Sequence, residues 1–270
     1  MPHRFIQLAG ALTALLTLSC AGPSPTAESR IEPTPPLRLV TYNIKHGHGM
    51  DGVVNLDRIA AVLRPLDADV IFLQEVDQGC ARSGQADQPA ALAGALGLES
   101  RFGAFRPYDG GRYGMAILTR LPVRRAEVIA LPPGPNPLTC LELELDFHGT
   151  SITVTGLHLV MTEAQRLAQA RFLANRYRDA SRPIILAGDL NSERESPILE
   201  VLGAQFDYPA KRAAPLTFPS VDPVKEIDFF LFAPKGAWTI EEHRVVDETV
   251  ASDHRPVSVS ARLPALRSGR

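Results

Sequence analysis

Asp69-Val70-Ile71-Phe72-Leu73-Gln74-Glu75 is an almost continuous apolar run that ends in two polar residues. Such a run is typical of a strand that is covered on both faces. A second β-rich run spans residues 37–43, and between the two runs apolar residues recur at helical spacing, at Leu56, Ile59, Ala60 and Leu63. Strand, helix and strand in this order predict a βαβ crossover. Asn43 and Glu75 should then lie at the same edge of a parallel pair, on strands about 4.8 Å apart.

The rest of the chain predicts further strands and helices. We expect strands at 112–119, 126–131, 138–147, 151–159, 183–187 and 226–232, and a last strand that begins at Asp253-His254. Helices are expected at 88–96, from Thr162 onward and at 196–202. The break His148-Gly149-Thr150 predicts a hairpin turn, and Thr162 with Gln165 forms a capping-box pattern. No internal repeat or sharp change of composition divides the chain, so we expect one domain over residues 37–265.

Length and composition are those of a globular protein that can bury a substantial core. The chain has 270 residues, is 45% hydrophobic and carries a formal net charge of -2. This near-neutral charge argues against electrostatic binding of nucleic acid by the whole molecule, although a local basic groove remains compatible with it.

The N-terminal segment has the pattern of an export signal. Residues 1–20 combine a basic residue, Arg4, with a short apolar run, which predicts a signal peptide. Thr17-Leu18-Ser19-Cys20 is similar to a bacterial lipoprotein signal, so Cys20 is a candidate lipid attachment site. Residues 21–36 are rich in Pro, Ser and Thr and predict a flexible linker. We therefore expect an exported protein, either a periplasmic or outer-membrane lipoprotein with a membrane tether through Cys20, or a secreted protein.

Two further cysteines leave two possibilities open. In an oxidising compartment Cys80 and Cys140 could form a disulfide. Alternatively, they could remain unpaired and pack as small apolar groups.

Four of the apolar runs end in polar residues, at Asn43, Gln74-Glu75, His158 and Asp189-Leu190-Asn191, and Asp253-His254 stand at the entrance to the last strand. The oxygen ligands of Asn43, Glu75 and Asp253 suit a hard cation such as Mg²⁺. Asp189 and Asn191 could point together at an attacking water, although this pair could also simply cap a turn. His254 could contact a phosphate, with Asp228 holding its ring. Together the residues predict a metal-assisted site for phosphate ester hydrolysis.

Six short motifs carry a resemblance to a known family. They are TYNI around Asn43, LQEV around Glu75, GLHL around His158, GDLN around Asp189 and Asn191, EIDFF around Asp228 and SDHRPV around Asp253 and His254. In this order they resemble the endonuclease/exonuclease/phosphatase superfamily, which includes DNase I-like nucleases, neutral sphingomyelinases and inositol polyphosphate 5-phosphatases. The resemblance implies an α/β fold, a four-layer sandwich of two packed mixed β-sheets flanked by helices.

The resemblance also implies a role for each site residue. Glu75 would bind Mg²⁺ or Mn²⁺ with support from Asn43, and Asp253 would lie next to the metal or the water. Asp189 would position or deprotonate the water, with Asn191 beside it. Asp228 would orient His254, and His158 would contact the phosphate or assist the leaving group. Members of the family differ in whether the Asp189 or the His254 position is the general base, and we favour Asp189. Arg112, Tyr113 and Arg255 are further candidates for contact with the substrate phosphate.

These expectations leave several functions open. We expect a monomeric, exported, Mg²⁺- or Mn²⁺-dependent enzyme that hydrolyses phosphodiester or phosphomonoester bonds. A nuclease acting on DNA or RNA would need a basic groove. A sphingomyelinase or phosphoinositide-type enzyme would need an apolar rim, for which Phe102, Phe105 and the loop 132–137 are candidates. A catalytically silent binding scaffold is the alternative outside enzymes.

Overall fold

The computed structural model describes Met1 and residues 34–132, 138–160 and 162–263. By its internal contacts the chain divides into two units, Met1–Pro33 and Thr34–Arg270. The expected signal peptide with Cys20, most of the expected linker, the loop segment 133–137 and residues 264–265 lie outside the described residues. These expectations therefore stay predictions.

The first sheet has six strands and contains the predicted crossover. Its order is β10 (Thr239–Val245), β11 (Val257–Arg262), β1 (Leu37–Asn43), β2 (Val70–Gln78), β4 (Gly111–Thr119) and β3 (Glu99–Tyr108). β1 and β2 run parallel with Asn43 beside Gln74, and α1 (Leu56–Leu63) connects them. All other pairs in this sheet are antiparallel. The predicted βαβ crossover is therefore confirmed.

The second sheet has five strands, in the order β5 (Val123–Ala130), β6 (Thr139–Phe147), β7 (Thr150–His158), β8 (Ile184–Asp189) and β9 (Asp228–Ala233). β6 and β7 form the predicted hairpin around His148 and Gly149. β7 and β8 are parallel, joined through α3 (Glu163–Arg176), whereas β9 returns antiparallel to β8. A short helix, α4 (Pro197–Gly203), follows β8.

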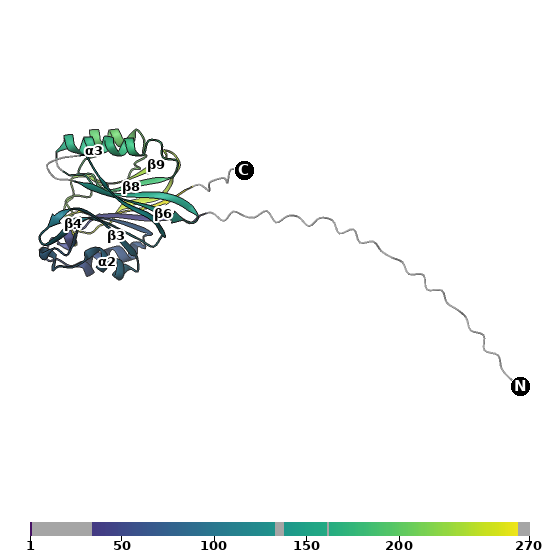
Figure 1. Ribbon diagram of the computed structural model, residues 1–270, viewed down its shortest axis with the longest axis horizontal. Coiled ribbons are helices and arrows are strands. Elements are labelled where there is room, and N and C mark those ends of the chain that lie inside the picture. Colours follow the sequence, from purple (N-terminus) through teal and green to yellow (C-terminus); the bar gives the residue numbers. More distant parts are fainter. Residues whose placement is uncertain (2–33, 133–137, 161, 264–270) are drawn as a thin grey trace. The chain divides into compact units, whose positions relative to one another are not determined.

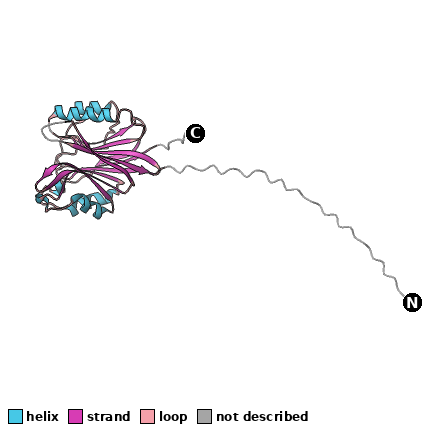
Figure 2. Ribbon diagram, viewed as in Figure 1, coloured by secondary structure: helices cyan, strands magenta, loops and turns pink. Residues whose placement is uncertain are grey.

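The two sheets pack face to face between two layers of helices (Figures 1 and 2). Inward-facing side chains of β1 and β2, such as Leu39 and Phe72, belong to the core that the second sheet shares. Outward-facing ones, such as Val40 and Ile71, pack with residues of α1 and α2 (Gln88–Leu96). α3 lies on the opposite side, outside β8 and β9 (Figure 1). The implied four-layer sandwich is confirmed, and it brings β1 against β8 and β9.

Local signals in the sequence fix where the helices begin and end. The Asn55 side chain accepts a hydrogen bond from the Arg58 N–H at the start of α1, and Gly97 in the left-handed conformation ends α2. The predicted capping box of Thr162 and Gln165 is present at the start of α3. Three short 3₁₀ helices complete the connections, at Lys45–Gly47, Arg64–Leu66 and Ala81–Ser83.

Some expected strand boundaries were wrong. β11 begins at Val257 rather than at Asp253, because Pro256 has no N–H to donate to a ladder and restricts the residue before it. β9 begins at Asp228 rather than at Glu226. The edge strands β3 and β10 were not predicted, since both are rich in exposed polar residues and lack a clear apolar alternation.

Cys80 and Cys140 are both buried and unpaired, which is the second of the two possibilities that the sequence left open. In the part of the chain that the structure describes, no helix has the length and apolarity needed to cross a membrane.

Gly188, which precedes Asp189 in β8, lies where the backbones of β7 and β8 approach closely, and a substitution there tests this approach. It has a φ of +149°, and a Cβ there would overlap the carbonyl oxygen of Leu157 on β7. We expect Gly188→Ala to lower the free energy of unfolding by about 1–3 kcal/mol, because either the strand pair or the backbone must shift. Urea unfolding followed by the fluorescence of Trp238, the only tryptophan, measures this change.

Gly94→Ala is the matched control for this substitution. Gly94 lies within α2 and nothing is within 4 Å of a Cβ built on it. The same added methyl should there raise the free energy of unfolding by about 0.5–1 kcal/mol, because alanine is the better helix former. Equal effects of the two substitutions would contradict the close approach of β7 and β8 at Gly188.

Candidate active site

The carboxyl ends of β7 and β8 and the amino end of β9 place three polar residues in a row. Asp189 on β8 pairs with His158 on the parallel strand β7, and with Asp228 on the antiparallel strand β9. All three side chains are buried. Because β1 packs against β8, Asn43 at the end of β1 reaches this row from the first sheet. The sandwich therefore brings residues that are up to 185 positions apart in the chain to one edge.

A β-bulge directs Glu75 towards Asn43. The pairing of β2 with β4 shifts between Leu73 and Val76, and Glu75 itself has a φ of +56°. Leu73 and Val76 both belong to the core under α1 and α2, so the regular alternation of faces is broken between them. A bulge of this kind re-aims a side chain. Here it gives the Glu75 side chain a hydrogen bond with Asn43 and leaves 28% of it exposed.

Asn43 connects the two sheets through its amide group. Its Nδ2 donates to Oε1 of Glu75 at 3.0 Å and to Oδ2 of Asp189 at 3.2 Å. Its Oδ1 accepts from the backbone N–H of Lys45 at 3.1 Å, which fixes the orientation of the amide. The side chain is fully buried. Asn43 thus holds two carboxylates of different sheets within reach of one another.

The Asp189 carboxylate lies between two imidazoles. Its Oδ1 accepts from the backbone N–H of Asn191 at 2.8 Å, while its Oδ2 lies 3.6 Å from Nε2 of His158 and 3.7 Å from Nε2 of His254. Burial raises the pKa of Asp189 and the carboxylate of Asp228 raises it further, although both histidines act in the opposite direction. Asn191 has a φ of +46°, so Asp189 and Asn191 also form the turn that the sequence allowed as an alternative to a catalytic role.

His254 is held by Asp228. Its Nδ1 lies 3.0 Å from Oδ2 of Asp228, and the ring of Phe218 covers it at a centroid distance of 4.7 Å. Burial alone would lower the pKa of His254, but the carboxylates of Asp228 and Asp189 outweigh burial and raise this pKa to about 10. His254 is therefore an imidazolium at neutral pH, with its Nε2 directed towards Asp189.

Asp253 lies beside this cluster with its own cationic partner. The Nζ of Lys45 is 2.8 Å from its Oδ2, and the adjacent Ser252 hydroxyl donates to the carbonyl oxygen of Asn43 at 2.7 Å. These contacts fix the loop before β11 to the end of β1. Lys45 and Ser252 were missed by the sequence reasoning, although both are neighbours of motif residues in the chain.

The donor set fits a divalent cation. Glu75, Asp189 and Asp228 lie in the cluster with Asp253 at its side, and Lys45 and His254 are cationic partners of Asp253, Asp189 and Asp228. Among the described residues, Oδ1 of Asp228 is buried without a hydrogen-bond partner. Ligand atoms of Asp189, Asp228 and His254 lie within 4.8 Å of one another, but His254 already contacts Asp228. Glu75 with Asn43 is the more accessible oxygen-ligand pair for a hard cation.

The three candidate phosphate contacts are not equivalent. The ring of Tyr113 lies 5.7 Å from that of Phe105, which in turn lies 5.9 Å from His158. Burial and the charge of Glu75 both raise the pKa of the Tyr113 hydroxyl. Tyr113 therefore lies at the flank of the cluster, next to a residue that was expected to form an apolar rim.

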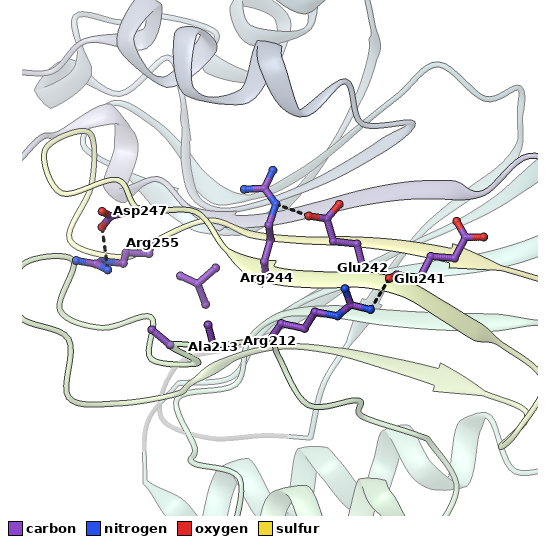
Figure 3. A pocket seen from close by; sticks show the side chains of 9 residues that line it. Arg212, Ala213, Glu241, Glu242, Arg244, Asp247 and Arg255 are labelled. Atoms are coloured by element: carbon purple, nitrogen blue, oxygen red, sulfur yellow. Dashed lines mark hydrogen bonds and ion pairs between the residues drawn. The ribbon is translucent and has the colours of Figure 1, made fainter.

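The two arginines make contacts outside the cluster. Arg112 donates to Gln78 and lies over the ring of Phe102. Arg255 donates to the carbonyl oxygen of Ser220 at 2.7 Å and pairs with Asp247. Figure 3 shows Arg255 on the wall of a separate cavity of about 750 Å³, where Arg212 and Arg244 also contact acidic residues or their backbone. The structure thus brings Tyr113, but neither arginine, next to the cluster.

Sequence reasoning missed an ion network of Arg194, Lys211 and Glu226 next to the site. Arg194 donates to both carboxylate oxygens of Glu226 at 3.0 Å, and Nζ of Lys211 lies 2.6 Å from the same carboxylate. Arg194 lies three residues after Asn191, and Glu226 two residues before Asp228. Their ion pair therefore connects the loop after β8 to the start of β9. The signal that could have revealed it is the charged residue beside each motif.

A family model described as the endonuclease/exonuclease/phosphatase family matches residues 40–254, which span every residue of this cluster. The chain belongs to the endonuclease/exonuclease/phosphatase family. Members of this family are phosphoester hydrolases and generally depend on a divalent metal. A comparison with curated protein sequences gave no significant match.

Solved structures of family members share the DNase I-like fold. An endonuclease/exonuclease/phosphatase from Beutenbergia cavernae is 25% identical with a TM-score of 0.70, covering 85% of this chain and 72% of that one. A mannosyl-6-phosphatase from Bacteroides thetaiotaomicron is 17% identical with a TM-score of 0.68, covering 83% and 99%. The human Nocturnin catalytic domain with a bound sulfate is 19% identical with a TM-score of 0.65, covering 85% and 94%.

The charge of His254 provides a test of the arrangement. We expect Asp228→Asn to lower the pKa of His254 by about 1–3 pH units, because the nearest opposite charge is lost while the burial remains. NMR titration of the imidazole in metal-free protein measures this pKa. An unchanged value would show that Asp228 does not control the charge of His254.

The same variant should change the pH dependence of stability. The pKa of His254 is raised in the folded protein, so its stabilisation is complete below the ordinary histidine pKa and is lost as the pH rises through about 10. The stability difference between wild type and Asp228→Asn should therefore be larger at about pH 6 than at about pH 10.

Proposed function

We propose that this chain hydrolyses phosphate esters by in-line attack of a water molecule that Asp189 activates. The observation that carries the proposal is the position of Asp189, whose Oδ2 faces two imidazoles and the Asn43 amide, which come from three other segments of the chain. Convergence of an acid, two imidazoles and an accessible carboxylate at one edge is what such chemistry needs.

The two ionisation states favour Asp189 over His254 as the general base. A base must be able to accept a proton at the working pH, and a pKa raised towards neutrality makes it more effective. Burial moves the pKa of Asp189 in that direction. His254, in contrast, is an imidazolium because of Asp228 and Asp189, so it can donate a hydrogen bond to a phosphate oxygen but cannot accept the proton of the water.

The remaining residues would hold the substrate and the cation. Glu75, oriented by Asn43, would bind Mg²⁺ or Mn²⁺, with Asp253 next to it. A bound divalent cation would neutralise the phosphate and the developing charge on the leaving oxygen. His158, with its Nε2 towards Asp189, would also contact the phosphate, and the Tyr113 hydroxyl is available at the flank.

Export and a lipid anchor are part of the proposal. The sequence pattern around Cys20 favours cleavage of residues 1–20 and attachment of lipid to this cysteine. If so, Cys20→Ala should move the protein from the membrane fraction to the soluble fraction of cells that process bacterial lipoproteins, whereas Cys80→Ala should not. Equal membrane recovery of both variants would contradict the anchor.

Hydrolysis of bis(p-nitrophenyl) phosphate and p-nitrophenyl phosphate tests the central proposal. We expect turnover in Mg²⁺ or Mn²⁺ and none in EDTA. Asp189→Ala should reduce kcat by about 10²–10⁴-fold, because the water loses its base. The preferred compound distinguishes a diesterase from a monoesterase. Metal-dependent turnover that survives in Asp189→Ala would contradict the assigned role.

Glu75→Ala separates an enzyme from a silent binding scaffold. Because its side chain is partly exposed and its hydrogen bond is with Asn43, the variant should remain folded by circular dichroism and lose metal-dependent turnover. Asp57→Ala, an exposed acid in the first turn of α1, is the matched control and should retain turnover. A wild-type protein without turnover on either compound and on nucleic acid and phospholipid panels would favour the scaffold.

A further inference from the structure

A cavity of about 360 Å³ adjoins the catalytic cluster at His254. Its walls come from the first turns of α3, the loop after β8 and the loop before β9. The lining side chains that matter here are Glu163, Arg166, Asn191, Glu193, Phe218 and Lys225. Since His254 belongs both to this cavity and to the cluster, a group attached to a phosphate in the cluster can extend into the cavity.

We propose that this cavity binds the non-reacting part of the substrate, and that this part is a single uncharged polyhydroxylated ring. The substrate class is then a sugar phosphate. This inference rests on the proposed phosphoesterase function and specifies the substrate of the same site.

Most of the cavity wall is polar, and some of its polar groups are free to bind a ligand. Only Phe218 and Ile227 among the lining residues are apolar. The side chains of Lys225, Asn191 and Glu163 make no hydrogen bond to any other described residue. An ammonium, an amide and a carboxylate together offer both donors and acceptors, which is what the hydroxyl groups of a sugar require.

Phe218 gives this polar cavity one aromatic face. Its backbone N–H donates to the carbonyl oxygen of Lys225 at 3.1 Å, and the Lys225 N–H donates back at 2.9 Å, so the two residues are held side by side. The ring of Phe218 also packs against His254 at 4.7 Å. An aromatic face carries partial negative charge and attracts the C–H groups of a sugar ring. The face and the ammonium can therefore contact one ring together.

The charges on the wall disfavour the other substrates of the family. Glu163 and Glu193 oppose Arg166 and Lys225, and the positive charge of His254 is balanced by Asp228 and Asp189, so the cavity has no large excess of either charge. A nucleic acid or a highly phosphorylated inositol would meet two carboxylates of like charge. A lipid chain would bury the polar wall without hydrogen bonds. The volume lies near the lower end of ligand cavities, which are about 300–1,000 Å³, and so fits one ring rather than a polymer.

Calorimetric titration of the full chain tests the assignment. The Asp189→Asn variant is used with Mg²⁺ so that ligands are not consumed. The ligands are the 6-phosphates of glucose, mannose and galactose, inorganic phosphate, inositol hexakisphosphate and an oligothymidine of eight nucleotides. We expect at least one hexose 6-phosphate to bind about tenfold or more tightly than inorganic phosphate, because its hydroxyls bond a charged group, and more tightly than both polyanions.

Lys225→Met in the same background identifies the cavity as the origin of this preference. It should weaken binding of the hexose 6-phosphate about tenfold and change binding of inorganic phosphate by less than about twofold. Lys235→Met is the matched control, since Lys235 contacts the carbonyl oxygen of Gly203 and does not line the cavity, and it should bind as the parent protein does.

The outcomes are distinct. Hexose 6-phosphates that bind no more tightly than inorganic phosphate, or less tightly than a polyanion, overturn the sugar assignment even if the wild-type protein hydrolyses p-nitrophenyl esters. Equal effects of Lys225→Met and Lys235→Met also overturn it. Lys225-dependent sugar phosphate binding by a wild-type protein that hydrolyses no phosphate ester would support the cavity and contradict the proposed function.

Discussion

The two hydrogen bonds that the Asn43 amide donates are the interaction on which the site depends. They join Glu75 of the first sheet to Asp189 of the second. An aspartate at position 43 would have the same shape but would add a further negative charge between two carboxylates. The amide instead supplies two donors and no charge, which lowers the cost of placing acids close together away from water. The same side chain thus links the two sheets and sets the geometry of the site.

The cluster also separates its two histidines in role. His254 has a buried carboxylate on each side, so its positive charge is stabilised although the ring is buried. His158 approaches Asp189 with Nε2, whereas its Nδ1 has no hydrogen-bond partner among the described residues. The difference follows from the strand order. Asp228 lies on β9 and His158 on β7, on either side of β8, and Asp228 contacts His254. Two chemically identical side chains therefore meet the same carboxylate with different partners behind them.

The sequence predicted the central part of this arrangement because the relevant signals were local and periodic. The run before Glu75 was almost continuously apolar, the short run before Asn43 was β-rich and the helix between them had clear spacing, so the parallel pair could be predicted. The bulge at Glu75 could not, because it depends on how β2 pairs with β4. The edge strands were missed since their faces are mostly in water. Arg112 and Arg255 were candidates only by position in the chain, and side-chain partners in distant loops decided where they point.

The ion network of Arg194, Glu226 and Lys211 joins the loop after β8 to the segment before β9. Glu226 receives both cations, one from the loop after β8 and one from the segment before β9. Removing one partner would leave an unpaired charge in the interior, which is more costly than losing a surface pair. The network therefore holds the segments that carry Asn191 and Asp228 in one position. Lys225 takes no part in these ion pairs but directly precedes Glu226 and pairs with Phe218 through the backbone, so the network also positions this wall of the cavity beside His254.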